Sequence, residues 1–166
     1  MGTGGDFAAI QVFSLPDFKQ VAEWQHNKTP IQGQVRVMHS ILKEIDQQLR
    51  ANGTPNPEIY WTIENNTLGE AAIVTVDEMG EDKFPGYFLH EPRKGGQQRR
   101  VVRKGYNTTN KSKVTACSKL KAWVETDKIT LFSKPLIREL KVFVAKGNSF
   151  EAKSGEHDDL VSALLL

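Results

Sequence analysis

The 166-residue sequence contains a single cysteine, Cys117, which excludes a disulfide framework and a zinc site built from cysteines. No apolar run approaches the roughly 20 residues that a membrane-spanning helix needs, and no charged-then-apolar leader opens the chain. Hydrophobic residues make up 39% and charged residues 25% of the chain, which excludes long disorder. We therefore expect one soluble domain in a reducing cytoplasm, with no membrane as partner.

Acidic residues are missing from one long stretch of the chain. Between Pro92 and Val124 there is no Asp or Glu, and ten basic residues give this basic segment a charge of +10. The remainder carries −8, so the net charge of +2 hides a strong asymmetry. Such asymmetry is typical of a protein with a polyanionic partner, above all nucleic acid. The alternative is a solvated loop followed by a charged helix.

Hydrophobic patterning predicts alternating strands and helices. Apolar and β-branched runs predict strands, and apolar spacings of three and four predict helices. Thr67 with Glu70 three residues on predicts a capping box. The order predicts an α/β layered domain with a mixed sheet. The expected strands are 7–15, 18–26, 58–63 and 87–90, with a short extended piece at 129–132; the expected helices are 34–50, 67–79, 110–126 and 158–166, with a further apolar pattern over 135–144.

Acidic residues stand at positions where they are costly without a partner. Glu64 follows the apolar strand 58–63, at the strand end where open α/β sheets bind ligands. Alternatively, Glu64 only begins a loop with Asn65 and Asn66. Asp158 and Asp159 follow His157 at an expected helix start, where a carboxylate caps free amides.

Two neighbouring acids repel each other, and both cannot cap one helix. A divalent cation relieves that repulsion, and Mg²⁺ prefers carboxylate oxygens. Asp6, after a glycine-rich turn, is a third acid, for which a turn-stabilising role is the alternative. An acid at a strand end together with an acid pair at a late helix start matches the requirements of two-metal phosphoryl chemistry.

Three segments of the sequence resemble the nuclease domain of the large terminase subunit of tailed phages, and the large myovirus type most closely. These are 2–13, 59–72 (IYWTIENNTLGEAA) and 150–164 (FEAKSGEHDDLVSAL). The Glu-Asn-Asn segment and the Gly-x-His-Asp-Asp-Leu-Val segment are each moderately specific, and their order and spacing strengthen the resemblance. It extends over essentially the whole chain.

The resemblance implies an RNase H-like fold with a mixed central sheet flanked by helices. It implies a Mg²⁺- or Mn²⁺-dependent endonuclease that cuts concatemeric double-stranded viral DNA in the host cytoplasm, at the procapsid portal. Portal protein and the small terminase subunit are the implied protein partners. By the same resemblance Glu64, Asp158 and Asp159 are metal ligands, Asp6 is an accessory acid, and His157 orients water or contacts phosphate.

The family places its first acid on a strand just upstream of the glycine-rich turn, and this sequence begins within that turn. We therefore expect residues 1–166 to be one nuclease domain cut short at both ends. The first strand, its Asp and the upstream ATPase domain would then be absent, and the activity of residues 1–166 alone weak or nil.

The basic segment fits DNA binding through phosphates, which needs no sequence readout. Two alternatives remain open: a resolvase- or integrase-like nuclease of the same fold, and a non-catalytic DNA-binding module. The predicted DNA-binding residues are Arg93, Lys94, Arg99, Arg100, Arg103, Lys104, Lys111 and Lys113.

Overall fold

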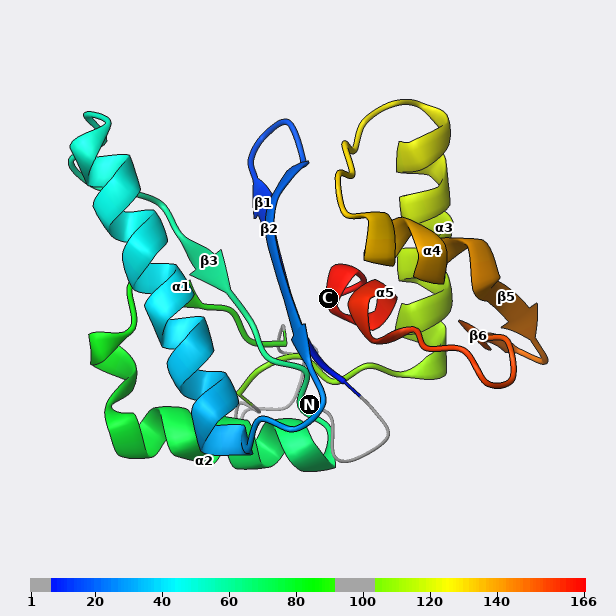
Figure 1. Ribbon diagram of the computed structural model, residues 1–166, viewed down its shortest axis with the longest axis horizontal. Helices are drawn as coiled ribbons and strands as arrows, with labels where there is room; N and C mark the ends of the chain where they lie inside the picture. The colour runs from blue at the N-terminus through cyan, green and yellow to red at the C-terminus, as the bar shows by residue number, and fades with distance from the viewer. Residues whose placement is uncertain (1–6, 92–103) are drawn as a thin grey trace, which may run out of the picture. The chain divides into compact units, whose positions relative to one another are not determined.

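The computed structural model describes residues 7–91 and 104–166 (Figure 1). The chain divides into two compact units. Unit 1 comprises residues 1–28 and 108–166, and unit 2 comprises residues 29–107. Among the described residues, no helix has both the length and the hydropathy needed to cross a membrane.

Unit 2 contains helices and one small parallel sheet within its described residues. Within its described residues the elements are α1 (Ile31–Ala51), β3 (Tyr60–Trp61), α2 (Thr67–Met79), the 3₁₀ helix η1 (Glu81–Lys83) and β4 (Tyr87–Phe88). The strands β3 and β4 pair in parallel, Tyr60 with Tyr87 and Trp61 with Phe88. A crossover containing α2 joins them, as parallel pairing requires.

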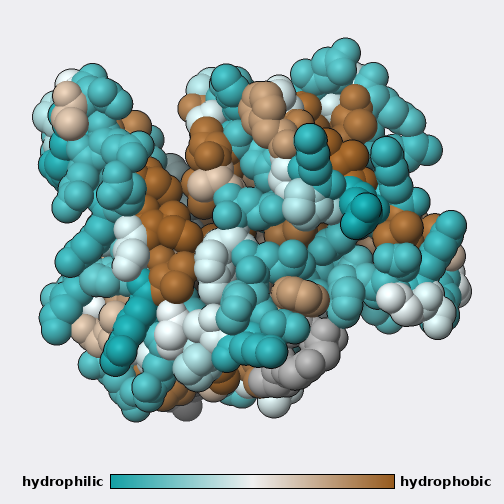
Figure 2. Space-filling view, in the orientation of Figure 1, coloured by the Kyte–Doolittle hydropathy of each residue, from teal (hydrophilic) through white to brown (hydrophobic). Residues whose placement is uncertain are grey.

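The long helix α1 is amphipathic. Its buried side chains include Val35, Met38 and Leu42, at the spacing that places residues on one helix face. The opposite face is charged and polar, and it forms the hydrophilic surface along α1 in the space-filling view (Figure 2). Helix α2 contributes Ile73 and Val76 to the buried residues of unit 2.

Aromatic rings fill the core of unit 2 beside the strands. Trp61 stacks on Phe88 with ring centroids 4.2 Å apart, and Phe84 lies 5.5 Å from Trp61. Trp61 and Phe84 are almost fully buried. The aromatic and β-branched composition that predicted this strand therefore reflects real burial.

Unit 1 contains two antiparallel hairpins and three helices within its described residues. The elements are β1 (Ala8–Ser14), β2 (Lys19–His26), α3 (Asn110–Glu125), α4 (Lys134–Val142), β5 (Phe143–Lys146), β6 (Ser149–Ala152) and α5 (Asp159–Leu164). The hairpin of β1 and β2 pairs Ala8 with His26 at one end and Ser14 with Lys19 at the other, with an irregularity between Val12 and Phe13.

The core of unit 1 lies where α4 and α5 meet. Leu136 of α4 and Leu160 and Val161 of α5 have no exposed surface. Partly buried hydrophobic residues surround them, including Ala9 from β1 and Phe143 from β5. The start of α5, which carries the predicted acid pair, is therefore anchored by its own buried residues.

The expected elements are confirmed in outline, with two local corrections. The helix over 67–79 is capped by the Asn66 side chain, which accepts from Gly69 N, so the predicted Thr67 cap was wrong by one residue. The hairpin of β5 and β6 was not expected. Its turn carries Gly147 at φ 57°, a conformation that glycine adopts without strain. The described strands pair two by two, in both parallel and antiparallel senses.

Candidate active site

Glu64 lies just beyond β3, on backbone that is still extended and paired. It forms an isolated parallel bridge with Tyr106. The Tyr106 amide donates to Ile63 O at 2.9 Å, and Tyr106 O accepts from Asn65 N at 2.7 Å. The Glu64 backbone is thus held on both sides while its half-buried side chain extends from a strand end. Glu64 is a structured position and not merely the start of a loop.

The residues after Glu64 hold its carboxylate and backbone in place. Asn66 Nδ2 donates to Glu64 Oε2 at 2.9 Å, and Asn66 Oδ1 caps α2 by accepting from Gly69 N at 2.8 Å. A Cβ on Gly69 would lie 1.6 Å from Glu64 O, so only glycine fits at this position. Asn65 Nδ2 donates to Lys104 O at 2.8 Å. The Glu-Asn-Asn–Gly motif is therefore one hydrogen-bonded assembly around Glu64.

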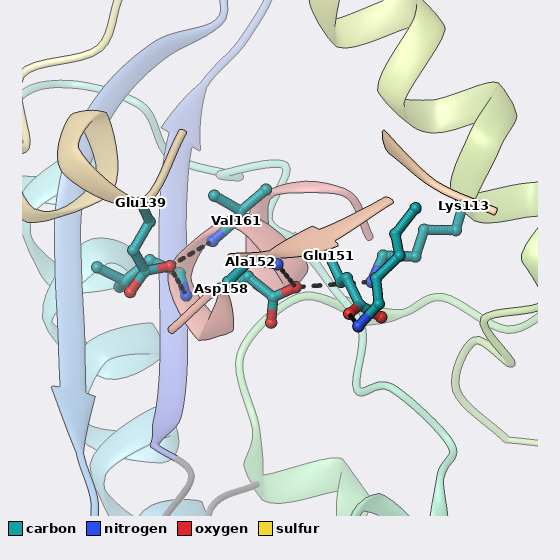
Figure 3. Close-up of polar contacts among 8 residues, drawn as sticks. Lys113, Glu139, Glu151, Ala152, Asp158 and Val161 are labelled. Carbon is teal, nitrogen blue, oxygen red and sulfur yellow. Dashed lines mark hydrogen bonds and ion pairs between the residues drawn. The ribbon is translucent and has the colours of Figure 1, made fainter. Parts of the chain in front are cut away.

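Asp158 lies in unit 1 at the start of α5, and its side chain does not cap that helix. Its Oδ2 accepts from Ala152 N at 3.2 Å and lies 3.8 Å from Lys113 Nζ (Figure 3). Among the described residues, Asp158 Oδ1 accepts no hydrogen bond. His157 Nδ1 lies 3.6 Å from Asp159 Oδ2, which places the second acid beside the imidazole.

Glu139, which the sequence analysis missed, provides the cap of α5. Its Oε2 accepts from Leu160 N at 2.8 Å and from Val161 N at 3.2 Å (Figure 3). Its Oε1 accepts from Gln25 Nε2 at 3.1 Å. Burial raises the pKa of the Glu139 carboxyl, and these hydrogen bonds oppose the rise. Glu139 stands three residues after Leu136, on the buried face of α4. An acid at a buried helix position needs a partner, and this is the sequence signal that could have identified Glu139.

The predicted DNA-binding residues have different environments. Lys111 is exposed in the first turn of α3, whereas Lys113 is half-buried and faces Asp158. Lys104 Nζ lies 2.5 Å from both Asp77 Oδ1 and Glu81 Oε2, and the hydrogen bonds to these acids raise the Lys104 pKa. The remaining predicted residues lie outside the described residues: Asp6, Arg93, Lys94, Arg99, Arg100 and Arg103.

Cys117 is partly buried in α3. Loss of hydration is the largest effect on its thiol and raises the pKa, while the positive charge of Lys113 opposes the rise. A thiol with a raised pKa is a poor nucleophile at neutral pH. The sequence interpretation of Cys117 as a packing residue is consistent with this environment.

The described acids suit a hard cation in their chemistry. Asp158 and Asp159 are neighbours in the sequence, and Asp158 Oδ1 accepts no hydrogen bond from the described residues, which leaves it for a further partner. Among the described residues, no three His, Cys, Asp or Glu side chains group closely enough to hold a metal ion. Unit 1 holds His157, Asp158, Asp159 and Lys113, and unit 2 holds Glu64.

A family model described as the terminase RNaseH-like domain matches residues 1–166. The chain belongs to this family. Its structure also matches the crystal structure of the large terminase nuclease from thermophilic phage G20c, with a TM-score of 0.59 and 18% sequence identity. The match covers 100% of this chain and 76% of that chain. The predicted RNase H-like fold and the resemblance to phage terminase nucleases are thereby confirmed.

Proposed function

We propose that this terminase RNase H-like domain is a divalent-metal-dependent endonuclease that cuts concatemeric double-stranded DNA during viral packaging. The family match over residues 1–166 is the observation that carries the proposal. The positions of Glu64 and Asp158 support it, because the backbone at Glu64 is hydrogen-bonded to that of Tyr106 and the Asp158 carboxylate accepts from Ala152 N. Mg²⁺ or Mn²⁺ is the proposed cofactor.

In this proposal the carboxylates of Glu64, Asp158 and Asp159 hold the cations, and Asp6 is an accessory acid. Bound divalent cations supply a water of lowered pKa and stabilise the leaving 3′-oxygen of the phosphodiester. Asn66 keeps the Glu64 carboxylate oriented through its 2.9 Å hydrogen bond. His157 orients the Asp159 carboxylate from 3.6 Å. No protein nucleophile is required.

Duplex DNA is the proposed substrate, and the basic segment is its proposed contact. Lys111 is exposed on α3 and suits a phosphate contact that positions DNA without reading sequence. We further propose, from family membership alone, that the parent protein acts at the portal with the small terminase subunit, in the host cytoplasm.

Plasmid cleavage tests the proposed function. In the full-length gene product that carries residues 1–166, Glu64→Gln and Asp158→Asn should each abolish Mn²⁺-dependent cleavage of supercoiled plasmid. Glu125→Gln changes an exposed acid of α3 and should leave cleavage unchanged. Wild-type rates for both site variants would overturn the assignment.

The same preparation separates the rival functions. A strong preference for four-way junctions over linear duplex would indicate a resolvase-like nuclease. Salt-sensitive DNA binding without cleavage and without Mn²⁺ binding would indicate a DNA-binding module.

A further inference from the structure

The first backbone amides of α5 need hydrogen-bond acceptors from outside the helix. The N–H groups in the first turn of a helix have no partner within the helix. Leu160 and Val161 are fully buried, so water cannot satisfy their amides. The residue that ordinarily meets this need is the N-cap, here Asp158.

Asp158 does not meet this need, because Glu139 does. Both buried amides donate to Glu139 Oε2, a carboxylate brought from α4. Glu139 has only 8% of its surface exposed, and its other oxygen accepts from Gln25 of β2. The Glu139 carboxylate therefore links α4 to α5 and β2, and both of its oxygens accept hydrogen bonds.

The capping by Glu139 changes what Asp158 can do. The Asp158 carboxylate lies against Ala152 N and near Lys113, away from the amides of its own helix (Figure 3). Without Glu139, the same carboxylate would be the nearest acceptor in sequence for those amides, and a carboxylate at an N-cap is stabilising.

We propose that Glu139 is a positioning residue: it caps α5 so that the Asp158 carboxylate stays away from the helix amides, with its Oδ1 available to a divalent cation. The presence of a cation at Asp158 rests on the proposed function, whereas the capping of α5 by Glu139 does not. Removal of Glu139 recruits Asp158 to the helix terminus, which costs cation affinity as well as stability.

A thermodynamic cycle tests the capping relation without any metal. Glu139→Ala, Asp158→Ala and the double variant are compared by thermal unfolding midpoint. Asp158→Ala should lower the midpoint more in the Glu139→Ala background than in the wild type, because Asp158 caps α5 only in that background. Equal shifts in the two backgrounds would overturn the proposal, whatever the metal result.

Mn²⁺ titration by calorimetry tests the consequence for the cation. Glu139→Met keeps the side-chain length and removes both carboxylate oxygens, and it serves if Glu139→Ala does not fold. We expect Glu139→Ala, or Glu139→Met in its place, to raise the Mn²⁺ Kd about tenfold, while Glu125→Gln leaves it unchanged. A Kd within about twofold of wild type in a less stable Glu139→Ala or Glu139→Met protein would make the role merely structural.

The two experiments distinguish the proposal from the function on which it rests. Unequal midpoint shifts together with no Mn²⁺ binding by the wild type would leave Glu139 as the cap but overturn the metal-dependent function. Mn²⁺ binding that is equal in the wild type and in the variant without the capping carboxylate (Glu139→Ala or Glu139→Met) would overturn the positioning role and leave the proposed nuclease standing.

Discussion

Lys104 shows how one basic residue of the basic segment also serves the fold. Its ammonium group pairs with Asp77 on α2 and Glu81 on η1, and its carbonyl accepts from Asn65 beside Glu64. The lysine therefore connects the helix that follows Glu64 to the chain that pairs alongside it. Its contact with DNA stays a prediction, and the ion pairs give it a structural role of its own.

Lys104→Met should lower the stability of unit 2 by roughly 0.5–1 kcal/mol, a small value because the side chain is 38% exposed and surface ion pairs are screened. The urea midpoint measures the change. Lys111→Met, at an exposed position, should leave the midpoint unchanged but weaken DNA binding. If Lys104→Met weakens DNA binding as much as Lys111→Met does and leaves the urea midpoint unchanged, the structural role of Lys104 is refuted.

At the scale of elements, α2 is placed by its contact with the end of the preceding strand. Gly69 lies in the first turn of α2, where the backbone of Glu64 approaches too closely for any side chain. Asn66 caps the helix and bonds the Glu64 carboxylate at the same time. The helix start and the acid are therefore one unit, and a displacement of one displaces the other.

Gly69→Ala should destabilise the protein by about 1–3 kcal/mol, as overpacking does, and should abolish metal-dependent cleavage. Gly33→Ala is the matched control in α1. There the new Cβ meets side chains and not backbone: the Thr29 methyl at 2.8 Å and Pro30 carbons at 3.6 and 3.7 Å. Alanine also favours the helix over glycine. Thermal melting and plasmid cleavage measure both variants. Equal effects at the two glycines would contradict the close approach to Glu64.

At the scale of the whole molecule, charge is the dominant feature. A segment of +10 is joined to a remainder of −8, and the remainder contains every acid of the proposed site. Positive charge attracts the phosphates, while clustered acids repel them unless cations neutralise the site. Tight DNA binding and cation binding are therefore expected to support each other.

DNA affinity should fall steeply with salt, because each phosphate contact releases counterions. Six predicted contacts, leaving out the ion-paired Lys104 and Lys113, give a slope of log K against log salt of about −5. Lys111→Met should reduce this slope by about 1. Fluorescence anisotropy with a duplex of arbitrary sequence measures it. A slope shallower than about −2 would contradict the predicted interface.

Most of the fold followed from local patterns in the sequence. The apolar spacing over 34–50 and the aromatic run at 58–63 predicted α1 and β3, because both report burial on one face. The hairpin of β5 and β6 was missed, because its strands are short and only half-buried, with no clean alternation. The cap of α2 was displaced by one residue because Asn66 and Thr67 are both good caps.

The acids of the proposed site were chosen from their positions in the sequence and their role stays a prediction, whereas the interactions around them could not be foreseen. Glu64 follows an apolar strand and Asp158 precedes an apolar helix, and both positions can be read from the sequence. The bond from Asn66 to Glu64 and the cap from Glu139 to α5 depend on tertiary packing. Glu139 lies 21 residues before Leu160 in the chain, beyond the reach of local patterns.

The described residues on either side of 92–103 are hydrogen-bonded to one another. Glu91 N donates to Gly105 O at 3.0 Å, and Gly105 N donates to His90 Nδ1 at 3.2 Å. Because both ends are anchored to each other, the residues between them can change in number at small entropic cost. Six of the predicted DNA contacts lie between Glu91 and Gly105, and five of these lie within 92–103. Insertion or deletion within 92–103 can therefore change the number of basic residues while the backbone paired beside Glu64 stays in place.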